Sequence, residues 1–336
     1  MIQSSHPLVR YGWDDRWAAA AQSGEVPGRI TRVDRGECDV VTESGLVRAL
    51  SDSTRAQGDL APATGDWVVL GVGPDDKPVV DRVLPRRHTL VRRDPSEAVV
   101  DQVLVANVDT VAIVHGLDRP MPPGRLERFL VQAWDSGAAP LIVLTKADAA
   151  PVDEVAAIVR AVAGDVPILA TGRTADRTAG EGIAELRARI AAGTTAALIG
   201  ASGAGKSTLV NLLVGHDLLE TQTVRVRDAK GRHTTTAREL VLVPDGGAIV
   251  DTPGVRAVGV WADEDALHRV FGDIEELATQ CRFTDCAHDR EPGCAVRGVV
   301  DPRRLERYRS LLAEIEALAQ RESDRAGREP RGRKRR

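Results

Sequence analysis

The amino-acid sequence predicts an α/β protein with three structural parts: a small β-barrel, a doubly wound parallel sheet and a C-terminal helical segment. Short strand-type runs broken by turn residues occupy residues 28–93, as is typical of a small barrel. Apolar runs then alternate with helix-type stretches up to about residue 260, which is the pattern of a parallel sheet covered by helices. Two further helix-type stretches follow, with a Cys/His cluster between them.

Length and composition exclude several classes of protein. The chain has 336 residues, enough for two or three domains, and its 43% hydrophobic and 28% charged residues are close to globular averages. No run approaches the roughly 18–20 apolar residues that a membrane span needs, and residues 1–16 lack the pattern of a secretion signal. We therefore expect a cytoplasmic protein with no membrane partner.

The formal net charge of −4 conceals a basic C-terminus. Residues 325–336 carry seven Arg or Lys and one Glu, so the rest of the chain is acidic. Two interpretations of this tail remain open, a solvated disordered end or an electrostatic arm for nucleic acid.

The strand-type runs of the first part are five in number, at 29–33, 40–42, 46–50, 66–70 and 79–84. Five strands in such a short stretch indicate an OB-like barrel, a fold that commonly binds oligonucleotides. Basic side chains gather at its exit: Arg82, Arg86, Arg87, His88, Arg92 and Arg93. We favour RNA contact over a purely structural barrel with a charged rim. Residues 1–27 look like a short helical lead-in, to which we assign no role.

The second part begins with a βαβ unit. Strand-type runs at 111–114 and 141–144 flank a stretch with one apolar helical face, made by Leu126, Phe129, Leu130, Ala133 and Trp134. Further strands at 166–170 and 196–199, with helices at 153–162 and 183–191, extend this unit into a doubly wound sheet.

A phosphate-binding loop follows the strand at 196–199. Residues 200–207 read GASGAGKS, which matches GxxxxGK[ST], and a helix-type stretch comes next. Glycines let successive backbone N–H groups and a helix N-terminus face a phosphate, Lys206 neutralises the β- and γ-oxygens, and the Ser207 hydroxyl suits Mg²⁺.

The sequence TKAD at 145–148 follows the strand at 141–144, at the edge of the sheet where ligands bind. The Asp148 carboxylate can accept from guanine N1–H and the exocyclic amine, whereas adenine presents no such pair of donors. Lys146 can lie along the base. Together with a phosphate loop on the same sheet, the pattern predicts guanine recognition.

Two further elements fit a nucleotide switch. DTPG at 251–254 ends a strand and suits a carboxylate that holds a Mg²⁺-bound water, followed by a glycine whose N–H reaches the γ-phosphate. Between the phosphate loop and DTPG lies GRHTTT at 231–236, in which either Thr234 or Thr235 can close onto Mg²⁺ when the γ-phosphate is present.

Three cysteines and a histidine lie within fourteen residues, at Cys281, Cys286, His288 and Cys294. A Cys₃His set makes a closed, tetrahedral structural zinc site. Disulfides are the competing interpretation, but a chain without a secretion signal keeps its thiols reduced, and an odd third Cys beside a His fits metal better.

The order of these motifs is similar to that of a known class of GTPases. The usual GTPase order is phosphate loop, switch Thr, DxxG and then [NT]KxD, whereas this chain runs TKAD, phosphate loop, HTTT and DTPG, so the domain is circularly permuted. With a barrel before it and a Cys/His segment after it, the chain resembles the ribosome small-subunit-dependent GTPase family (RsgA, also called YjeQ) over about residues 28–320. TKAD departs from the commoner NKxD, and the threonine removes an amide that could support the phosphate loop. Residues 170–171 match the family's base-contacting Ser-Ala loop poorly, so we leave them out of the site.

The resemblance implies a GTPase stimulated by the small ribosomal subunit that acts in late subunit maturation, binds ribosomal RNA and is a monomer off the ribosome. Its cofactors would be GTP or GDP with Mg²⁺ and one structural Zn²⁺ on the Cys₃His set. The expected domains are an extension at 1–27, a barrel at 28–93, the permuted GTPase domain at 94–260, a helical zinc-binding domain at 261–323 and the tail at 324–336. The expected nucleotide contacts are Thr145, Lys146, Ala147, Asp148, Gly200, Ala201, Ser202, Gly203, Ala204, Gly205, Lys206, Ser207, Thr208, Thr234, Thr235, Asp251 and Gly254.

The catalytic residues expected are His233, Lys206 and Thr235, with Ser207 and Thr235 on Mg²⁺. Val255 stands where Ras-type enzymes carry the Gln that orients water, so slow intrinsic hydrolysis is expected, with His233 or a group from the partner positioning the water. Val255 also keeps open a second hypothesis, a guanine-nucleotide-dependent RNA-binding scaffold with negligible turnover. An ATP-using kinase is disfavoured by Asp148 and by the DTPG and HTTT elements.

Overall fold

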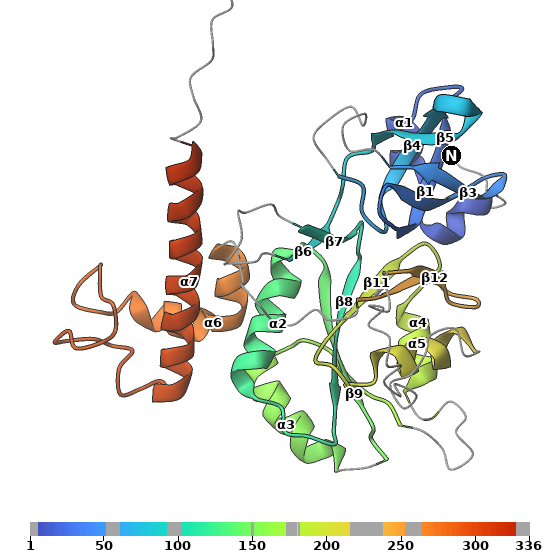
Figure 1. Cartoon of the computed structure of the whole chain (residues 1–336). Helices are drawn as coiled ribbons and strands as arrows, with labels where there is room; N and C mark the ends of the chain where they lie inside the picture. The colour runs from blue at the N-terminus through green and yellow to red at the C-terminus, as the bar shows by residue number, and fades with distance from the viewer. Residues whose placement is uncertain are drawn as a thin grey trace, which may run out of the picture.

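A computed structural model describes residues 6–51, 61–92, 102–148, 151–172, 180, 182–215, 238–252 and 264–326. These residues form a closed barrel, a six-stranded sheet with helices on both faces, and two C-terminal helices (Figure 1). The α/β fold class predicted from the sequence is thereby confirmed. Within the described ranges no helix is both long enough and apolar enough to cross a membrane.

The barrel consists of β1 (Val26–Val33), β2 (Glu37–Thr42), β3 (Gly45–Leu50), β4 (Trp67–Val72) and β5 (Pro78–Val83), with the short 3₁₀ turn η2 (Pro74–Asp76) between the last two. The strands follow the order β1-β2-β3-β5-β4, and all pairs are antiparallel except β3 with β5. Buried side chains from these strands fill the interior: Ile30, Cys38, Val40, Ala49, Val68 and Val80. All five strands expected here are present.

The N-terminal segment covers the outer face of β4. It contains the 3₁₀ helix η1 (Pro7–Tyr11) and the short helix α1 (Asp15–Ala20). Trp67 and Val69 point away from the barrel interior, because side chains alternate along a strand and Val68 points inward. The ring of Trp13 lies 4.9 Å from that of Trp67, centroid to centroid. The lead-in therefore gives Trp67 an apolar cover.

The central sheet has the order β10 (Ile168–Ala170), β9 (Ala139–Thr145), β8 (Thr110–Gly116), β11 (Thr195–Ile199), β13 (Ala248–Asp251) and β12 (Leu240–Leu242). The first five strands are parallel, and β12 pairs antiparallel with β13. The carboxyl ends of β8, β9 and β11 therefore lie next to one another, although a long stretch of sequence separates β11 from the other two.

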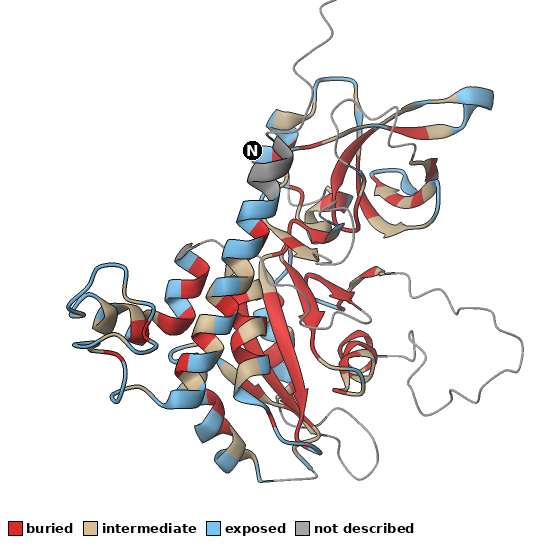
Figure 2. Cartoon of the chain, turned by 60° about the vertical axis from the view of Figure 1, so that its left-hand side comes forward, coloured by how far each residue is buried: buried red, intermediate tan, exposed pale blue. Residues whose placement is uncertain are grey.

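Helices cover both faces of this sheet. The helices α2 (Pro123–Asp135) and α3 (Val152–Ala163) pack on one face, and α4 (Ile183–Arg189) and α5 (Lys206–Val214) pack on the other. Successive residues of a strand point to opposite faces of the sheet and so pack in different cores. Ile113 packs in the core under α2 and α3, and Val114 packs in the core under α4 and α5. The strands of the sheet are buried along most of their length (Figure 2).

Within the described residues, the barrel contacts the sheet domain at several places. Between them in the chain, β6 (Thr89–Arg92) and β7 (Gln102–Ala106) form an antiparallel pair that the sequence analysis did not predict, and the Ala106 N–H donates to the Thr64 carbonyl at 2.9 Å. Another contact lies beside β12. There Arg32 of β1 forms a β-bridge with Glu239, and the Thr64 hydroxyl donates to the Arg238 carbonyl at 3.2 Å.

The C-terminal helices α6 (Glu264–Ala278) and α7 (Pro302–Ala326) belong to the same apolar core as α2. The Glu127 carboxylate of α2 is only 1% exposed and accepts from Arg304 at 3.0 Å and from Arg307 at 2.6 and 3.0 Å. A buried carboxylate needs such partners, since an unpaired buried charge is strongly destabilising. These two helices are therefore fixed to the sheet domain by packing and by an ionic cluster.

Candidate nucleotide-binding site and metal centre

The phosphate loop connects β11 to α5 and requires glycine at several positions. Gly200 has φ of +145°, and a Cβ there would lie 2.2 Å from the carbonyl oxygen of Val114 in β8. Gly203 and Gly205 also have positive φ, +75° and +95°. Side chains rarely tolerate these conformations, so the loop keeps its shape only with glycine. Ser207 and Thr208 follow in the first turn of α5.

Lys206 is 8% exposed, and its ammonium donates to the carbonyls of Gly200 at 2.9 Å and Ala201 at 3.2 Å. Burial lowers the pKa of Lys206, and the nearby Asp251 carboxylate opposes that shift. The ammonium therefore lies inside the loop that would surround a phosphate.

A hydroxyl and a carboxylate meet beside the lysine. The Ser207 hydroxyl donates to Asp251 Oδ2 at 2.8 Å, while Asp251 Oδ1 is buried and has no hydrogen-bond partner. Burial raises the pKa of Asp251, with Ser207 and Lys206 acting in the opposite direction. A buried acceptor without a partner is costly, and oxygen donors are what Mg²⁺ prefers. Ser207 and Asp251 therefore fit a magnesium ion.

The TKAD loop contacts the phosphate loop directly. The Thr145 hydroxyl donates to the Ala204 carbonyl at 2.5 Å, and Lys146 Nζ donates to the Gly203 carbonyl at 2.9 Å. Threonine at 145 lacks the amide of the commoner asparagine, as noted from the sequence, but its hydroxyl supports the phosphate loop instead. Asp148 is exposed at the same edge of the sheet, next to Ala147.

A segment that was left out of the site on its sequence lies beside Asp148. The Ala147 N–H donates to the Thr171 carbonyl at 3.1 Å, and a Cβ on Gly172 would lie 3.3 Å from Asp148 Oδ1. Residues 171–172 thus lie beside Ala147 and Asp148, and the carboxylate of Asp148 is the one expected to contact guanine. Their place at the end of β10, the strand next to β9, is the signal that identifies them, although their side chains match no motif.

The structure thus brings together the TKAD residues 145–148, the phosphate loop 200–207 with Thr208, and Asp251. The switch residues His233, Thr234, Thr235 and Gly254, together with Val255, lie outside the described residues.

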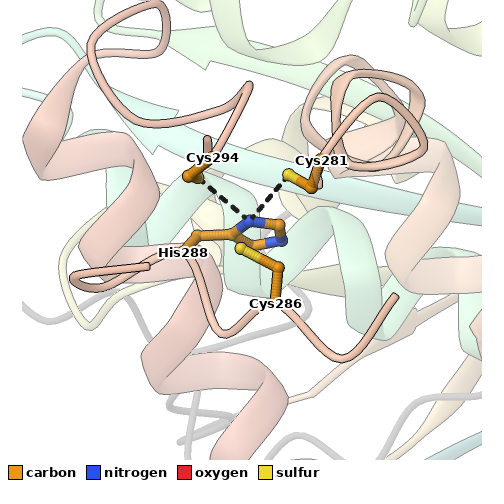
Figure 3. A group of neighbouring side chains, drawn as sticks. All are labelled: Cys281, Cys286, His288 and Cys294. Atoms are coloured by element: carbon orange, nitrogen blue, oxygen red, sulfur yellow. Dashed lines mark hydrogen bonds between the residues drawn. The ribbon is translucent and has the colours of Figure 1, made fainter. Parts of the chain in front are cut away.

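The four Cys/His residues also come together, in the loop between α6 and α7 (Figure 3). One ligand atom from each of Cys281, Cys286, His288 and Cys294 lies within 4.8 Å of all the others. A tetrahedral zinc site with bonds of about 2.3 Å places its sulfurs about 3.8 Å apart, so the spacing fits.

The surroundings of this cluster suit thiolate ligands. His288 Nδ1 faces Cys294 Sγ at 3.5 Å and Cys281 Sγ at 3.7 Å. Burial lowers the pKa of His288, which favours the neutral imidazole that binds metal. The backbone N–H groups of Ala295 and Arg297 donate to the sulfurs of Cys281 and Cys294, both at 3.3 Å. Such donors stabilise negative sulfur.

A phosphate loop at the carboxyl edge of a parallel sheet, with TKAD before it in the chain and Asp251 after it, defines a circularly permuted P-loop GTPase. The chain belongs to the RsgA GTPase family, whose model matches residues 83–261. It is therefore a GTP hydrolase.

Several known proteins are similar to most of the chain. A protein of Streptomyces avermitilis named "Small ribosomal subunit biogenesis GTPase RsgA" is 44% identical over 94% of this chain and 87% of its own length. A protein of Lactiplantibacillus plantarum named "Small ribosomal subunit biogenesis GTPase RsgA 2" is 39% identical over 92% of this chain and 89% of its own length. The crystal structure of YjeQ from Thermotoga maritima has a TM-score of 0.59 and 25% identity, covering 87% of this chain and 98% of that one. YloQ, described as a circularly permuted GTPase, shares the fold with a TM-score of 0.58 and 22% identity, covering 88% of this chain and 96% of that one.

Proposed function

We propose that this GTPase acts in maturation of the small ribosomal subunit and that the subunit stimulates its GTP turnover. Relatives that are similar to this chain over more than nine-tenths of its length carry the name "Small ribosomal subunit biogenesis GTPase". Their names support the proposal. A partner of this kind belongs to the cytoplasm.

The observation that carries the enzymatic assignment is the Ser207–Asp251 pair beside Lys206. Asp251 Oδ1 is buried and without a partner, as expected of an acceptor that completes its bonding only with magnesium and its waters. Magnesium, when bound, neutralises charge that develops on the phosphates. Lys206 and the loop N–H groups hold the β- and γ-phosphates, and Asp148 with residues 171–172 receives guanine.

The switch segments complete this assignment. We assign Thr235, or Thr234, to magnesium in the GTP state, the Gly254 N–H to the γ-phosphate and His233 to the attacking water. These roles rest on motif order.

One structural zinc ion on the Cys₃His set would hold the loop between α6 and α7. The barrel, this zinc loop and the basic tail then contact ribosomal RNA, with the protein a monomer off the ribosome. Binding through arginines weakens with rising salt concentration, because it releases counterions from the RNA.

The experiment is GTP turnover by the purified protein alone and with small subunits, large subunits or bulk RNA at matched phosphate concentration, with ATP as the control nucleotide. Strong stimulation by small subunits alone supports the proposal. Turnover near zero with every partner, despite tight GDP binding, favours the RNA-binding scaffold. In the same assay, His233→Ala is expected to lose stimulated turnover but to keep GDP affinity, and full retention of turnover would remove His233 from the mechanism.

A further inference from the structure

The loop after β8 carries a carboxylate that no motif accounts for. Asp118 Oδ2 lies 2.7 Å from Lys146 Nζ, and the same ammonium donates to the Gly203 carbonyl at 2.9 Å. Lys146 has φ of +60°, a left-handed conformation that non-glycine residues seldom adopt. Lys146 thus combines an unusual backbone conformation with an ammonium that has two partners.

The methylene groups of the Lys146 side chain, called its stem below, lie against the end of β8. A Cβ on Gly116 would lie 3.3 Å from both Cδ and Cε of Lys146, and 2.7 Å from Asp118 Oδ1. Glycine at 116 therefore leaves room for the stem and the carboxylate together.

Three successive carbonyls of the phosphate loop are fixed from this side. Ser202 accepts from Arg119 Nη1 at 3.2 Å, Gly203 accepts from Lys146, and Ala204 accepts from Thr145. Thr145 is the last residue of β9 and Lys146 follows it, whereas Arg119 follows β8. Residues that end or follow β8 and β9 thus bind three of the carbonyls of the phosphate loop.

Asp118 contributes little to stability. Its side chain is 37% exposed and that of Lys146 is 34% exposed, and an ion pair with this much solvent contact is weak. The hydrogen bond from Lys146 holds the pKa of Asp118 below its usual range, so the carboxylate is ionised at neutral pH. Asp118 therefore places a negative charge beside the Lys146 ammonium.

We propose that Asp118 is a positioning residue for the guanine nucleotide: it holds the Lys146 ammonium on the Gly203 carbonyl and so keeps the lysine stem where the base binds. The proposal rests on the nucleotide site assigned under the proposed function. Asp118 acts through Lys146 and touches neither phosphate nor base.

The test is a double-mutant cycle read by GDP affinity and steady-state GTP kinetics. Asp118→Ala is expected to weaken GDP binding about fivefold to tenfold and to raise KM for GTP, with kcat at saturation within about twofold of wild type. Asp118→Glu, which keeps the charge, restores most of the affinity. In a Lys146→Ala background, Asp118→Ala is expected to add nothing, because no ammonium remains to be held. Asp118 Oδ1 also lies 3.5 Å from Arg119 Nε, and Arg119 donates to the Ser202 carbonyl, so a second cycle combines Asp118→Ala with Arg119→Ala, in which the two losses are expected to add. Glu185→Ala, which removes a comparable exposed pair with Arg189 on α4, is the matched control and leaves GDP affinity unchanged.

The proposal would be overturned if Asp118→Ala lowered GDP affinity in the Lys146→Ala background as much as it does in wild type. It would also be overturned if Asp118→Ala bound GDP like wild type while Lys146→Ala bound it poorly. That second result leaves the nucleotide site intact. If Lys146→Ala itself binds GDP like wild type, the site assignment fails and the proposal fails with it. Thermal unfolding without nucleotide checks that each variant is folded, and Asp118→Asn replaces Asp118→Ala if the latter is not.

Discussion

The hydroxyl of Thr145 lies 2.5 Å from the carbonyl oxygen of Ala204, so the residue in place of the commoner asparagine supports the phosphate loop by a different chemical group. Thr145 is 6% exposed and Ala204 is 1% exposed, so the hydrogen bond lies in a region largely shielded from water.

Replacing that hydroxyl with a methyl group is expected to loosen the loop. Thr145→Val keeps the shape of the side chain but removes the donor, and an unsatisfied buried acceptor costs about 1–3 kcal/mol. GDP affinity, measured by titration calorimetry, is expected to fall about tenfold. Thr145→Ser keeps the donor and should bind like wild type. Equal losses in the two variants would mean that the methyl group, not the hydrogen bond, is what matters.

Asp251→Asn should separate folding from magnesium binding. Burial raises the pKa of Asp251, so its ionised form at neutral pH costs folding free energy in the absence of metal. As pH rises from the ordinary carboxyl pKa of about 3.9 through the raised pKa of the folded protein, wild type loses stability and Asp251→Asn does not.

The nucleotide-free variant is therefore expected to unfold at a higher temperature than wild type at neutral pH, with the difference narrowing at acid pH. With Mg²⁺ and GTP bound, wild type is expected to unfold at the higher temperature, and Asp251→Asn is expected to need more magnesium for GTP turnover. Melting curves over pH, with and without Mg²⁺, measure both effects. A variant less stable than wild type in both conditions would contradict this account of Asp251.

Zinc removal should affect the loop between α6 and α7 more than the nucleotide site. Those helices share a core with α2, which a chelator leaves in place. Metal analysis is expected to find one zinc per chain, lost in Cys294→Ala and kept in Cys38→Ala, whose thiol is buried in the barrel. Basal GTP turnover should survive the loss of zinc, while stimulation by small subunits falls. Loss of basal turnover in Cys294→Ala alone would show that the zinc loop is needed by the nucleotide site itself.

In the ionic cluster on α2, replacing the carboxylate of Glu127 is expected to cost less free energy of unfolding than replacing its two arginine partners. Arg304 and Arg307 are 18% and 30% exposed and can reach water if Glu127 is replaced, so Glu127→Gln should lower the free energy of unfolding by about 2 kcal/mol. The double variant Arg304→Ala/Arg307→Ala leaves a buried carboxylate alone and should cost about 3–5 kcal/mol. Urea unfolding measures both. Arg128→Ala, which removes a more exposed pair with Glu314, is the control. A larger loss in Glu127→Gln would contradict this order.

The elements that sequence reasoning identified are those whose signal is local. The phosphate loop needs glycine where φ is positive, and the alternation of Ile113 and Val114 between two cores is typical of a strand covered on both sides. The Cys₃His residues are close in the chain as well as in space.

The features that escaped sequence reasoning depend on distant partners. β12 has three residues and β6 has four, too few for a pattern of their own, and each is defined by the strand it pairs with. Asp118 is linked to the nucleotide site through Lys146, twenty-eight positions further along the chain. The cover that Trp13 gives to Trp67 likewise joins residues far apart in the chain.

The contacts between barrel and sheet limit how these two parts can move relative to each other. A body attached at one point can swing in any direction, whereas a body attached at several separate points cannot move without breaking some of its attachments. The barrel is joined through Ala106 and Thr64 at β7, and through the Arg32–Glu239 bridge at β12. Arg29 Nη2 of β1 also donates to the Asn107 carbonyl at 3.2 Å, so a displacement of the barrel would have to break hydrogen bonds at separate places at once.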